Sequence, residues 1–214
     1  MLRLRRYYSS GMMSGLLLIF FVTSGSIKKA AGEDGGELRL TSGWTVQSSC
    51  QVQSTGAEIS KVNFRTQGWH VATVPSTVVN ALVADGTYPD PFYGKNLESM
   101  AGIDYVDKTK PFSYQDMPPG SPFRCSWWYR TEFRLPEQYG QGPVWLHFDG
   151  INYRANIWVN GQKLADARDV AGTFRTFEFE ASKWHKCRRQ AEIQTDCHDG
   201  QLCRHAWEHL SGGL

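Results

Sequence analysis

Short segments of this chain alternate hydrophobic and polar residues. The alternation is clearest over residues 127–135, 144–149 and 154–159, and a further segment rich in Phe and Thr covers 173–180. A period of two places successive side chains on opposite faces of a strand, so these segments predict half-buried β-strands. Asn160-Gly161 follows the third segment directly and accepts positive φ at both positions, which predicts a tight hairpin. Closely spaced strands separated by Gly and Pro turns are typical of an antiparallel sandwich.

One face of each predicted strand is expected to form the hydrophobic core. The expected core residues are Trp127, Tyr129, Phe133, Leu146, Phe148, Ala155, Ile157, Val159 and Phe177. Arg130, Glu132 and His147 fall on the opposite face, where an exposed cross-strand ion pair would contribute little. Residues 78–83 have helical spacing, and Gly86 is placed to end a short helix there.

The beginning of the chain has the order of features of a secretory signal peptide. Arg3, Arg5 and Arg6 are basic, residues 12–22 are hydrophobic, and small residues follow at 23–26. The hydrophobic stretch is about half the roughly 20 residues that a transmembrane helix needs. We expect residues 1–26 to be a signal peptide and 27–36 a polar linker. The product would be secreted or periplasmic, without stable membrane insertion after cleavage; the alternative is an uncleaved anchor.

The composition of the chain and its lack of common catalytic motifs argue against several classes of function. The chain has 214 residues and a net charge of +2, which suits one globular domain after removal of a leader. So small a charge, with no basic stripe, argues against nucleic acid as a partner. The sequence contains no GxSxG, HExxH or P-loop motif, and we expect no cofactor.

Four runs of residues carry a family resemblance. They are WWYRTEF at 127–133, WLHFDGINY at 145–153, IWVNGQKL at 157–164 and GTFRTFEFE at 172–180. In wording and order they resemble the N-terminal domain of glycoside hydrolase family 2, most closely its exo-β-glucosaminidase and β-mannosidase branch. The resemblance covers roughly residues 38–184. It implies an all-β fold over 37–184, a galactose-binding-like jelly-roll sandwich with a short helix.

The segment 85–97, DGTYPDPFYGKNL, is the candidate binding loop. Aromatic rings stack on the C–H faces of sugars and short polar groups bind their hydroxyls. The residues alone favour a simpler interpretation, a rigid loop whose rings fill one end of the sandwich. The resemblance favours sugar, because in family 2 enzymes the matching loop reaches toward the catalytic barrel and an Asn faces the sugar. It implies that Asn96 contacts sugar, with Tyr93 and Asp90 beside it.

No catalytic centre is recognisable in this chain. Retaining glycosidases use two carboxylates about 5 Å apart. Family 2 places its acid/base, a Glu preceded by Asn, on a later barrel domain, and no Asn here is followed by Glu. We expect a truncated accessory domain of a secreted β-glycosidase, whose partners are carbohydrate and the parent's catalytic barrel, and which does not hydrolyse glycosides alone. The alternatives are a self-standing carbohydrate-binding module and, less favoured, an adhesion sandwich without a sugar site.

The segment 185–214 departs from the family pattern. Three of the five Cys and four of the six His fall there, and strand alternation stops. Because the Cys and His spacing does not fit a metal site, we expect an aberrant, out-of-frame or disordered tail in place of a sandwich strand. Cys50 and Cys125 lie within the sandwich region as small hydrophobic residues. We expect no disulfide that the fold requires.

Overall fold

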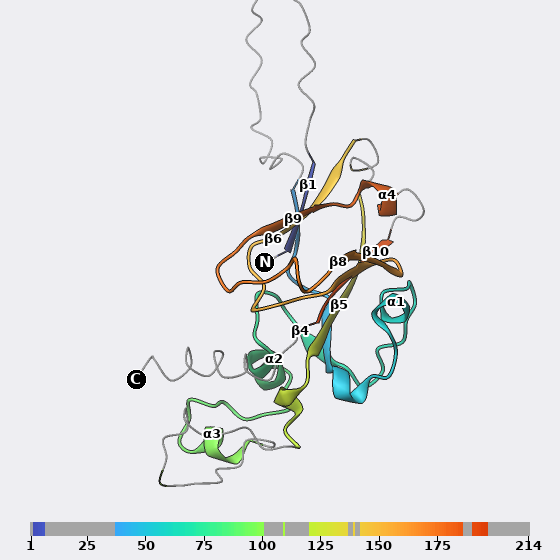
Figure 1. The fold of residues 1–214 in the computed structure, drawn as a ribbon. Helices are drawn as coiled ribbons and strands as arrows, with labels where there is room; N and C mark the ends of the chain where they lie inside the picture. Colours follow the sequence, from blue (N-terminus) through green and yellow to red (C-terminus); the bar gives the residue numbers. More distant parts are fainter. Residues whose placement is uncertain are drawn as a thin grey trace, which may run out of the picture.

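The strands form two antiparallel sheets (Figure 1). The computed structural model describes residues 2–6, 37–100, 109, 120–136, 139, 142–185 and 190–196. The strands are β1 (Leu2–Arg6), β2 (Glu37–Leu40), β3 (Trp44–Ser48), β4 (His70–Ala72), β5 (Trp127–Arg134), β6 (Val144–Phe148), β7 (Ile157–Val159), β8 (Gln162–Ala165), β9 (Phe177–Glu180) and β10 (Gln190–Asp196). The α-helices are α1 (Gly56–Ile59), α2 (Val78–Ala84), α3 (Asn96–Ser99) and α4 (Ser182–His185), and the 3₁₀ turns are η1 (Ser49–Gln51) and η3 (Pro122–Arg124). One sheet has the order β2-β1-β6-β9 and the other the order β4-β3-β5-β10-β7-β8.

The hydrophobic core takes side chains from both sheets, which confirms the predicted β-sandwich. Leu4, Leu146 and Phe177 come from the four-stranded sheet and pack in one cluster with Val46 and Ile157 of the other. The predicted core residues that are buried are Trp127, Leu146, Phe148, Ala155, Ile157, Val159 and Phe177. Tyr129 and Phe133 are partly buried and pack against the cluster.

Local sequence signals placed the hairpin and the main helix correctly. Asn160 and Gly161 join β7 to β8 with φ of 50° and 84°, the left-handed region that this two-residue turn requires. Thr77 caps α2 by accepting a hydrogen bond from the Asn80 amide at 3.2 Å. Gly86 follows the helix with φ of 81° and donates to the Val83 carbonyl at 3.1 Å.

The expected tail is wrong for residues 190–196. These residues form β10, which pairs with β5 over seven residues and with β7 on its other side. The segment QAEIQTD does alternate small or hydrophobic residues with polar ones, but its Cys- and Arg-rich flanks conceal the pattern. Residues 186–189 and 197–214 lie outside the described part of the chain.

The chain's first residues also form a strand, although their sequence was interpreted as the start of a signal peptide. β1 lies between β2 and β6, with Leu2 and Leu4 buried. Residues 7–36, including the hydrophobic stretch and the linker, lie outside the described residues, so cleavage of a leader stays a prediction. Within the described residues, no helix has the length and hydrophobicity needed to cross a membrane.

Two side chains expected at the surface are buried. Arg130 is only 5% exposed, because α1 and the turn after it cover the outer face of β5. It forms an ion pair with Glu132 on the same strand. His147 is 9% exposed and lies 2.7 Å from Glu178 and 3.1 Å from Asp149 through its two ring nitrogens. The period of two gives the face of a strand but does not reveal what covers that face.

The expectation that Cys50 and Cys125 are simply small hydrophobic residues is wrong, since the two form a disulfide. β3 pairs antiparallel with β5, and Ser48 is the partner of Trp127. Continuing that register by two residues in each chain direction places Cys50 opposite Cys125. Their Cα atoms are 5.9 Å apart, within the range for a disulfide.

Truncating a core residue of β6 should destabilise the sandwich. Leu146 is 1% exposed, so we expect Leu146→Ala to lower the free energy of unfolding by about 2–5 kcal/mol through lost burial and a residual cavity. Val71 of β4 is 68% exposed, and Val71→Ala is the control, expected to change it by less than about 0.5 kcal/mol. Urea denaturation measures both variants. Equal stability of the two variants would contradict the assignment of Leu146 to the core.

Candidate functional site

The loop 85–97 lies at the end of the sandwich where α2 and α3 are found (Figure 1). It begins at the cap of α2 and leads into α3, whose first residue is Asn96. α2 packs against β4, an edge strand of the six-stranded sheet. The loop is therefore attached through a short helix to one edge of the larger sheet.

The three predicted site residues lie together in one tight turn. The Asp90 carboxylate accepts a hydrogen bond from the Phe92 amide at 2.9 Å. The Asp90 main-chain carbonyl accepts one from the Asn96 side-chain amide, also at 2.9 Å. The Tyr93 amide donates to the same carbonyl at 3.2 Å, and Gly94 takes up a φ of 57° in the turn. Asp90 and Asn96 therefore order the turn that carries Tyr93.

The aromatic residues of the loop divide into exposed and anchored rings. Phe92 and Tyr93 are 72% and 77% exposed. Tyr88 is partly buried, and its ring centre lies 6.0 Å from that of the buried Phe123. Burial raises the pKa of the Tyr88 hydroxyl, so this side chain stays neutral at physiological pH. The Tyr88 ring therefore helps to fill the end of the sandwich, whereas the Phe92 and Tyr93 rings face outward.

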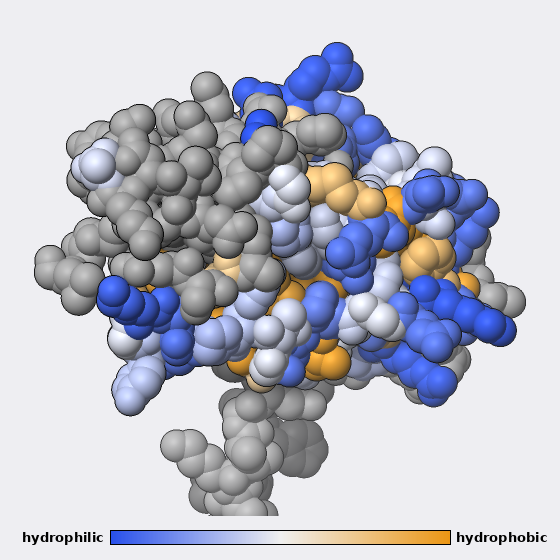
Figure 2. All heavy atoms as spheres, turned by 90° about the horizontal axis from the view of Figure 1, so that it is seen from below, coloured by the Kyte–Doolittle hydropathy of each residue, from blue (hydrophilic) through white to orange (hydrophobic). Residues whose placement is uncertain are grey.

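Figure 2 views the molecule from below the orientation of Figure 1, toward the end where α2 and α3 lie. Hydrophobic residues appear there as small areas between hydrophilic ones. The described surface in this view is therefore mixed in character.

A polar cluster holds the start of the loop. The His70 Nδ1 atom of β4 lies 2.7 Å from the Asp85 carboxylate and 3.1 Å from the Thr87 hydroxyl. Thr87 donates to Asp85 through both its hydroxyl, at 2.6 Å, and its amide, at 3.0 Å. Burial raises the pKa of Asp85, but the hydrogen bonds from Thr87 and His70 outweigh it and hold the pKa below its usual value. Sequence reasoning missed this cluster, because His70 and Asp85 meet only when α2 packs on β4.

Metal binding has no support in this region. Among the residues that the structure describes, no group of three or more His, Cys, Asp or Glu side chains is arranged to hold a metal ion. The exposed rings and polar groups of the loop can stack on a ligand and form hydrogen bonds with it.

A comparison with known protein families gives a match to part of this sandwich. Residues 122–202 match the glycosyl hydrolase 2 galactose-binding domain-like family. Over these residues the chain is a galactose-binding-like domain of glycoside hydrolase family 2. The match spans β5 to β10, so the family 2 pattern extends beyond residue 184, the end that the resemblance alone indicated.

Curated relatives are much longer glycosidases. The family 2 domain is 29% identical over 147 residues to an exo-β-D-glucosaminidase of Streptomyces avermitilis, covering 69% of this chain and 14% of the relative. It is 30% identical over 132 residues to a mannosylglycoprotein endo-β-mannosidase of Lilium longiflorum, covering 60% of this chain and 12% of that protein. This chain thus spans only a small part of the relatives' length.

A solved structure supports the same fold. The crystal structure of the exo-chitosanase CsxA of Amycolatopsis orientalis superimposes with a TM-score of 0.60 and 27% identity. The superposition covers 75% of this chain and 16% of that enzyme. The family 2 domain therefore corresponds to one sandwich within a much larger glycosidase.

Proposed function

We propose that this chain serves as the accessory sandwich of a β-glycoside hydrolase and that its loop 85–97 contacts the sugar. The observation that carries the proposal is the exposed Tyr93 ring on a turn ordered by Asp90 and Asn96. An ordered turn presents a ring without the entropy cost of fixing a mobile loop on binding. The similarity to exo-β-D-glucosaminidases suggests β-linked glucosamine as the sugar. The catalytic barrel of such an enzyme would be the partner that completes the site.

A self-standing carbohydrate-binding module is the second candidate. The two adjacent exposed rings of Phe92 and Tyr93 favour it, because a surface with stacking rings can bind sugar without a catalytic partner. The two functions differ in affinity. An accessory domain carries only part of a site and binds sugar weakly alone, whereas a binding module holds oligosaccharide by itself.

Substitutions in the loop test the sugar contact. We expect Tyr93→Ala to weaken binding of a β-linked glucosamine oligomer about three- to tenfold, through loss of ring stacking. Asn96→Ala should also weaken it, because that change removes an amide and its bond to the Asp90 carbonyl. Isothermal titration calorimetry measures both variants.

Phe174 provides the matched control, since it is 88% exposed and lies outside the loop. Phe174→Ala should leave the affinity unchanged. If neither loop variant loses affinity, the loop has no part in sugar binding. Equal loss in all three variants would indicate nonspecific adsorption to aromatic rings.

We further propose that the protein is exported through residues 1–26. Two observations support this: the basic and then hydrophobic beginning of the chain, and the Cys50–Cys125 disulfide, which suits an oxidising compartment. Mass spectrometry of protein recovered from the culture medium or periplasm should find a mature end near residue 27. Protein found only in the cytosol, with residues 1–26 intact, would contradict this proposal.

A further inference from the structure

β1 occupies an interior position of its sheet although it comes from the very start of the chain. On one side Leu2 to Arg5 pair with Leu40 to Glu37 of β2, and on the other Leu2 to Arg6 pair with Phe148 to Val144 of β6. β2 and β6 are joined in this sheet only through β1. We call the position between β2 and β6 the β1 slot. β2 and β6 lie on the two sides of the slot. Each offers main-chain hydrogen-bonding groups to a strand that lies between them.

The inner face of the β1 slot takes hydrophobic side chains. Leu2 and Leu4 are 3% and 1% exposed and belong to the core cluster. They pack in that cluster with Leu40 of β2, and with Leu146 and Phe148 of β6. A strand in the slot therefore needs hydrophobic residues at alternate positions.

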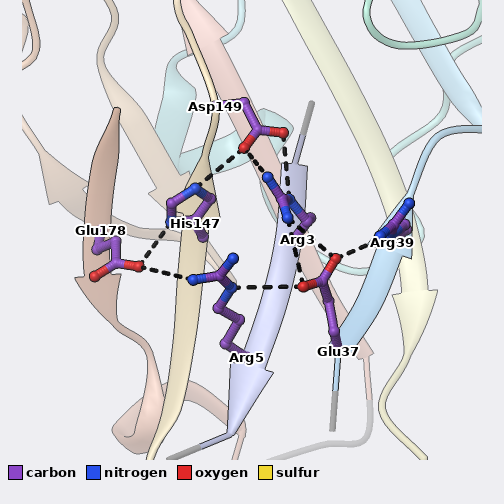
Figure 3. Close-up of polar contacts among 7 residues, drawn as sticks. All are labelled: Arg3, Arg5, Glu37, Arg39, His147, Asp149 and Glu178. Atoms are coloured by element: carbon purple, nitrogen blue, oxygen red, sulfur yellow. Dashed lines mark hydrogen bonds and ion pairs between the residues drawn. The ribbon is translucent and has the colours of Figure 1, made fainter. Parts of the chain in front are cut away.

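The outer face of the β1 slot is lined by carboxylates from three strands or their ends (Figure 3). Arg3 forms ion pairs with Asp149, just after β6, and with Glu37 of β2, the latter at 3.4 Å. Arg5 lies 3.5 Å from Glu37 and 3.9 Å from Glu178 of β9. The slot therefore favours basic residues at the positions between the hydrophobic ones.

Two further charged or titratable groups complete this network. His147 bridges Glu178 and Asp149, and Arg39 contacts Glu37 at 2.9 Å. Removal of Arg3 and Arg5 would take two positively charged partners away from the three carboxylates. An empty slot would therefore have two unpaired strand edges, hydrophobic side chains on its inner face and excess negative charge on its outer face.

We propose that the β1 slot is a binding site for an extended peptide segment in which hydrophobic and basic residues alternate, and that β1 is its occupant within the same chain. This mode of recognition is strand addition, in which main-chain hydrogen bonds give affinity and alternate side chains give specificity. If residues 1–26 are removed on export, the slot becomes available to a segment of the same chemistry from another chain. The inference rests on the pairing and contacts of β1 and stands independently of the sugar-binding function.

The test uses the full chain and separates β1 only after folding. A recognition sequence for a specific protease replaces residues 26–31, which lie outside the described part of the chain, and the purified protein is then cut. We expect the N-terminal fragment to stay associated on size exclusion. A fluorescent peptide of residues 1–8, MLRLRRYY, should exchange into the slot, with binding measured by anisotropy.

Two altered peptides test the two faces of the slot without changing the protein. A peptide with Arg3→Glu and Arg5→Glu should bind at least about tenfold more weakly, since charge-assisted hydrogen bonds are lost and like charges meet. A peptide with Leu2→Asp and Leu4→Asp should not bind. In the protein, Glu37→Gln together with Asp149→Asn should weaken binding of the unaltered peptide but not of the charge-reversed one.

The dependence of peptide affinity on pH provides a further test of the carboxylate contacts. Burial raises the pKa of both Glu37 and Asp149, but the neighbouring Arg side chains outweigh it and hold both pKa values below 4.5 and 3.8, respectively. The contribution of these carboxylates is complete above those ordinary values and is lost as the pH falls through the lowered ones. Peptide affinity should therefore decrease below about pH 4.

Three results would overturn the proposal. The cut fragment could leave with no exchange of the labelled peptide, or all peptides could bind equally, which would mean nonspecific adsorption of a basic peptide. The cut protein could also aggregate whether or not excess MLRLRRYY is present. Aggregation that the unaltered peptide prevents and the altered peptides do not would support the proposal.

Discussion

Reducing the Cys50–Cys125 disulfide is expected to lower the free energy of unfolding by about 4 kcal/mol. The bond closes a loop of 75 residues, and cross-linking a loop of that length removes conformational entropy from the unfolded chain worth about 4 kcal/mol. For a domain of this size, that loss lowers the melting temperature by about 8–16 °C. Thermal denaturation with and without reductant, with thiols blocked by iodoacetamide after reduction, measures the difference.

The matched control is the Cys50→Ala, Cys125→Ala double variant. Its melting temperature should be as low as that of the reduced protein and should not respond to reductant. An unchanged melting temperature on reduction would mean that the disulfide is not formed in solution. A response to reductant in the double variant would point to Cys187, Cys197 or Cys203 instead.

Replacing Arg130 by Met is expected to lower the free energy of unfolding by about 3–5 kcal/mol. The guanidinium donates to the main-chain carbonyls of Ile59 at 3.0 Å and Lys61 at 3.3 Å. It also lies over the Phe64 ring, 5.7 Å from its centre. Hydrogen bonds from a charged group contribute about 1.5–3 kcal/mol each, and Met would leave both carbonyls without this donor. Urea denaturation measures the loss, and limited proteolysis should show faster cleavage over residues 59–66.

Two further variants separate the roles of charge and geometry at Arg130. Glu132→Gln should cost less than about 1 kcal/mol, because the Glu132 side chain is partly exposed and its ion pair with Arg130 is screened by water. Arg130→Lys should recover only part of the stability, because an ammonium cannot reproduce the planar fork of a guanidinium. If Arg130→Met is as stable as the unaltered protein, the segment around α1 does not depend on this side chain.

The strands that the sequence predicted share one property, namely that their signals are local. Alternation over β5 and β6 and the Asn160-Gly161 turn each lie within a few residues. β1 and β10 each have their partners far away in the sequence. Basic residues ahead of a hydrophobic stretch are also typical of the start of a signal peptide. The Leu-Arg alternation at residues 2–6 therefore fits both a β-strand and a signal peptide.

Contacts between distant segments explain the remaining differences. The disulfide depends on the pairing of β3 with β5, and the burial of Arg130 depends on α1 covering a sheet face. Neither arrangement has a signature within a short window of sequence. The Asp90–Asn96 contact spans only six residues, so the local sequence of the loop was enough to suggest that these residues lie close together. The His70–Asp85 pair could not be found in this way, because it joins a strand to the end of a helix.

The position of β10 has a consequence for how the protein is made. The hairpin β7–β8 joins the rest of its sheet only through β10, which is the last of the described strands to be synthesised. While a ribosome is still translating the preceding residues, β5 and β7 each present an open edge with no neighbour between them. The larger sheet can therefore close only after residue 196 has emerged. Until then, the open edges of β5 and β7 can pair with strands of other nascent chains.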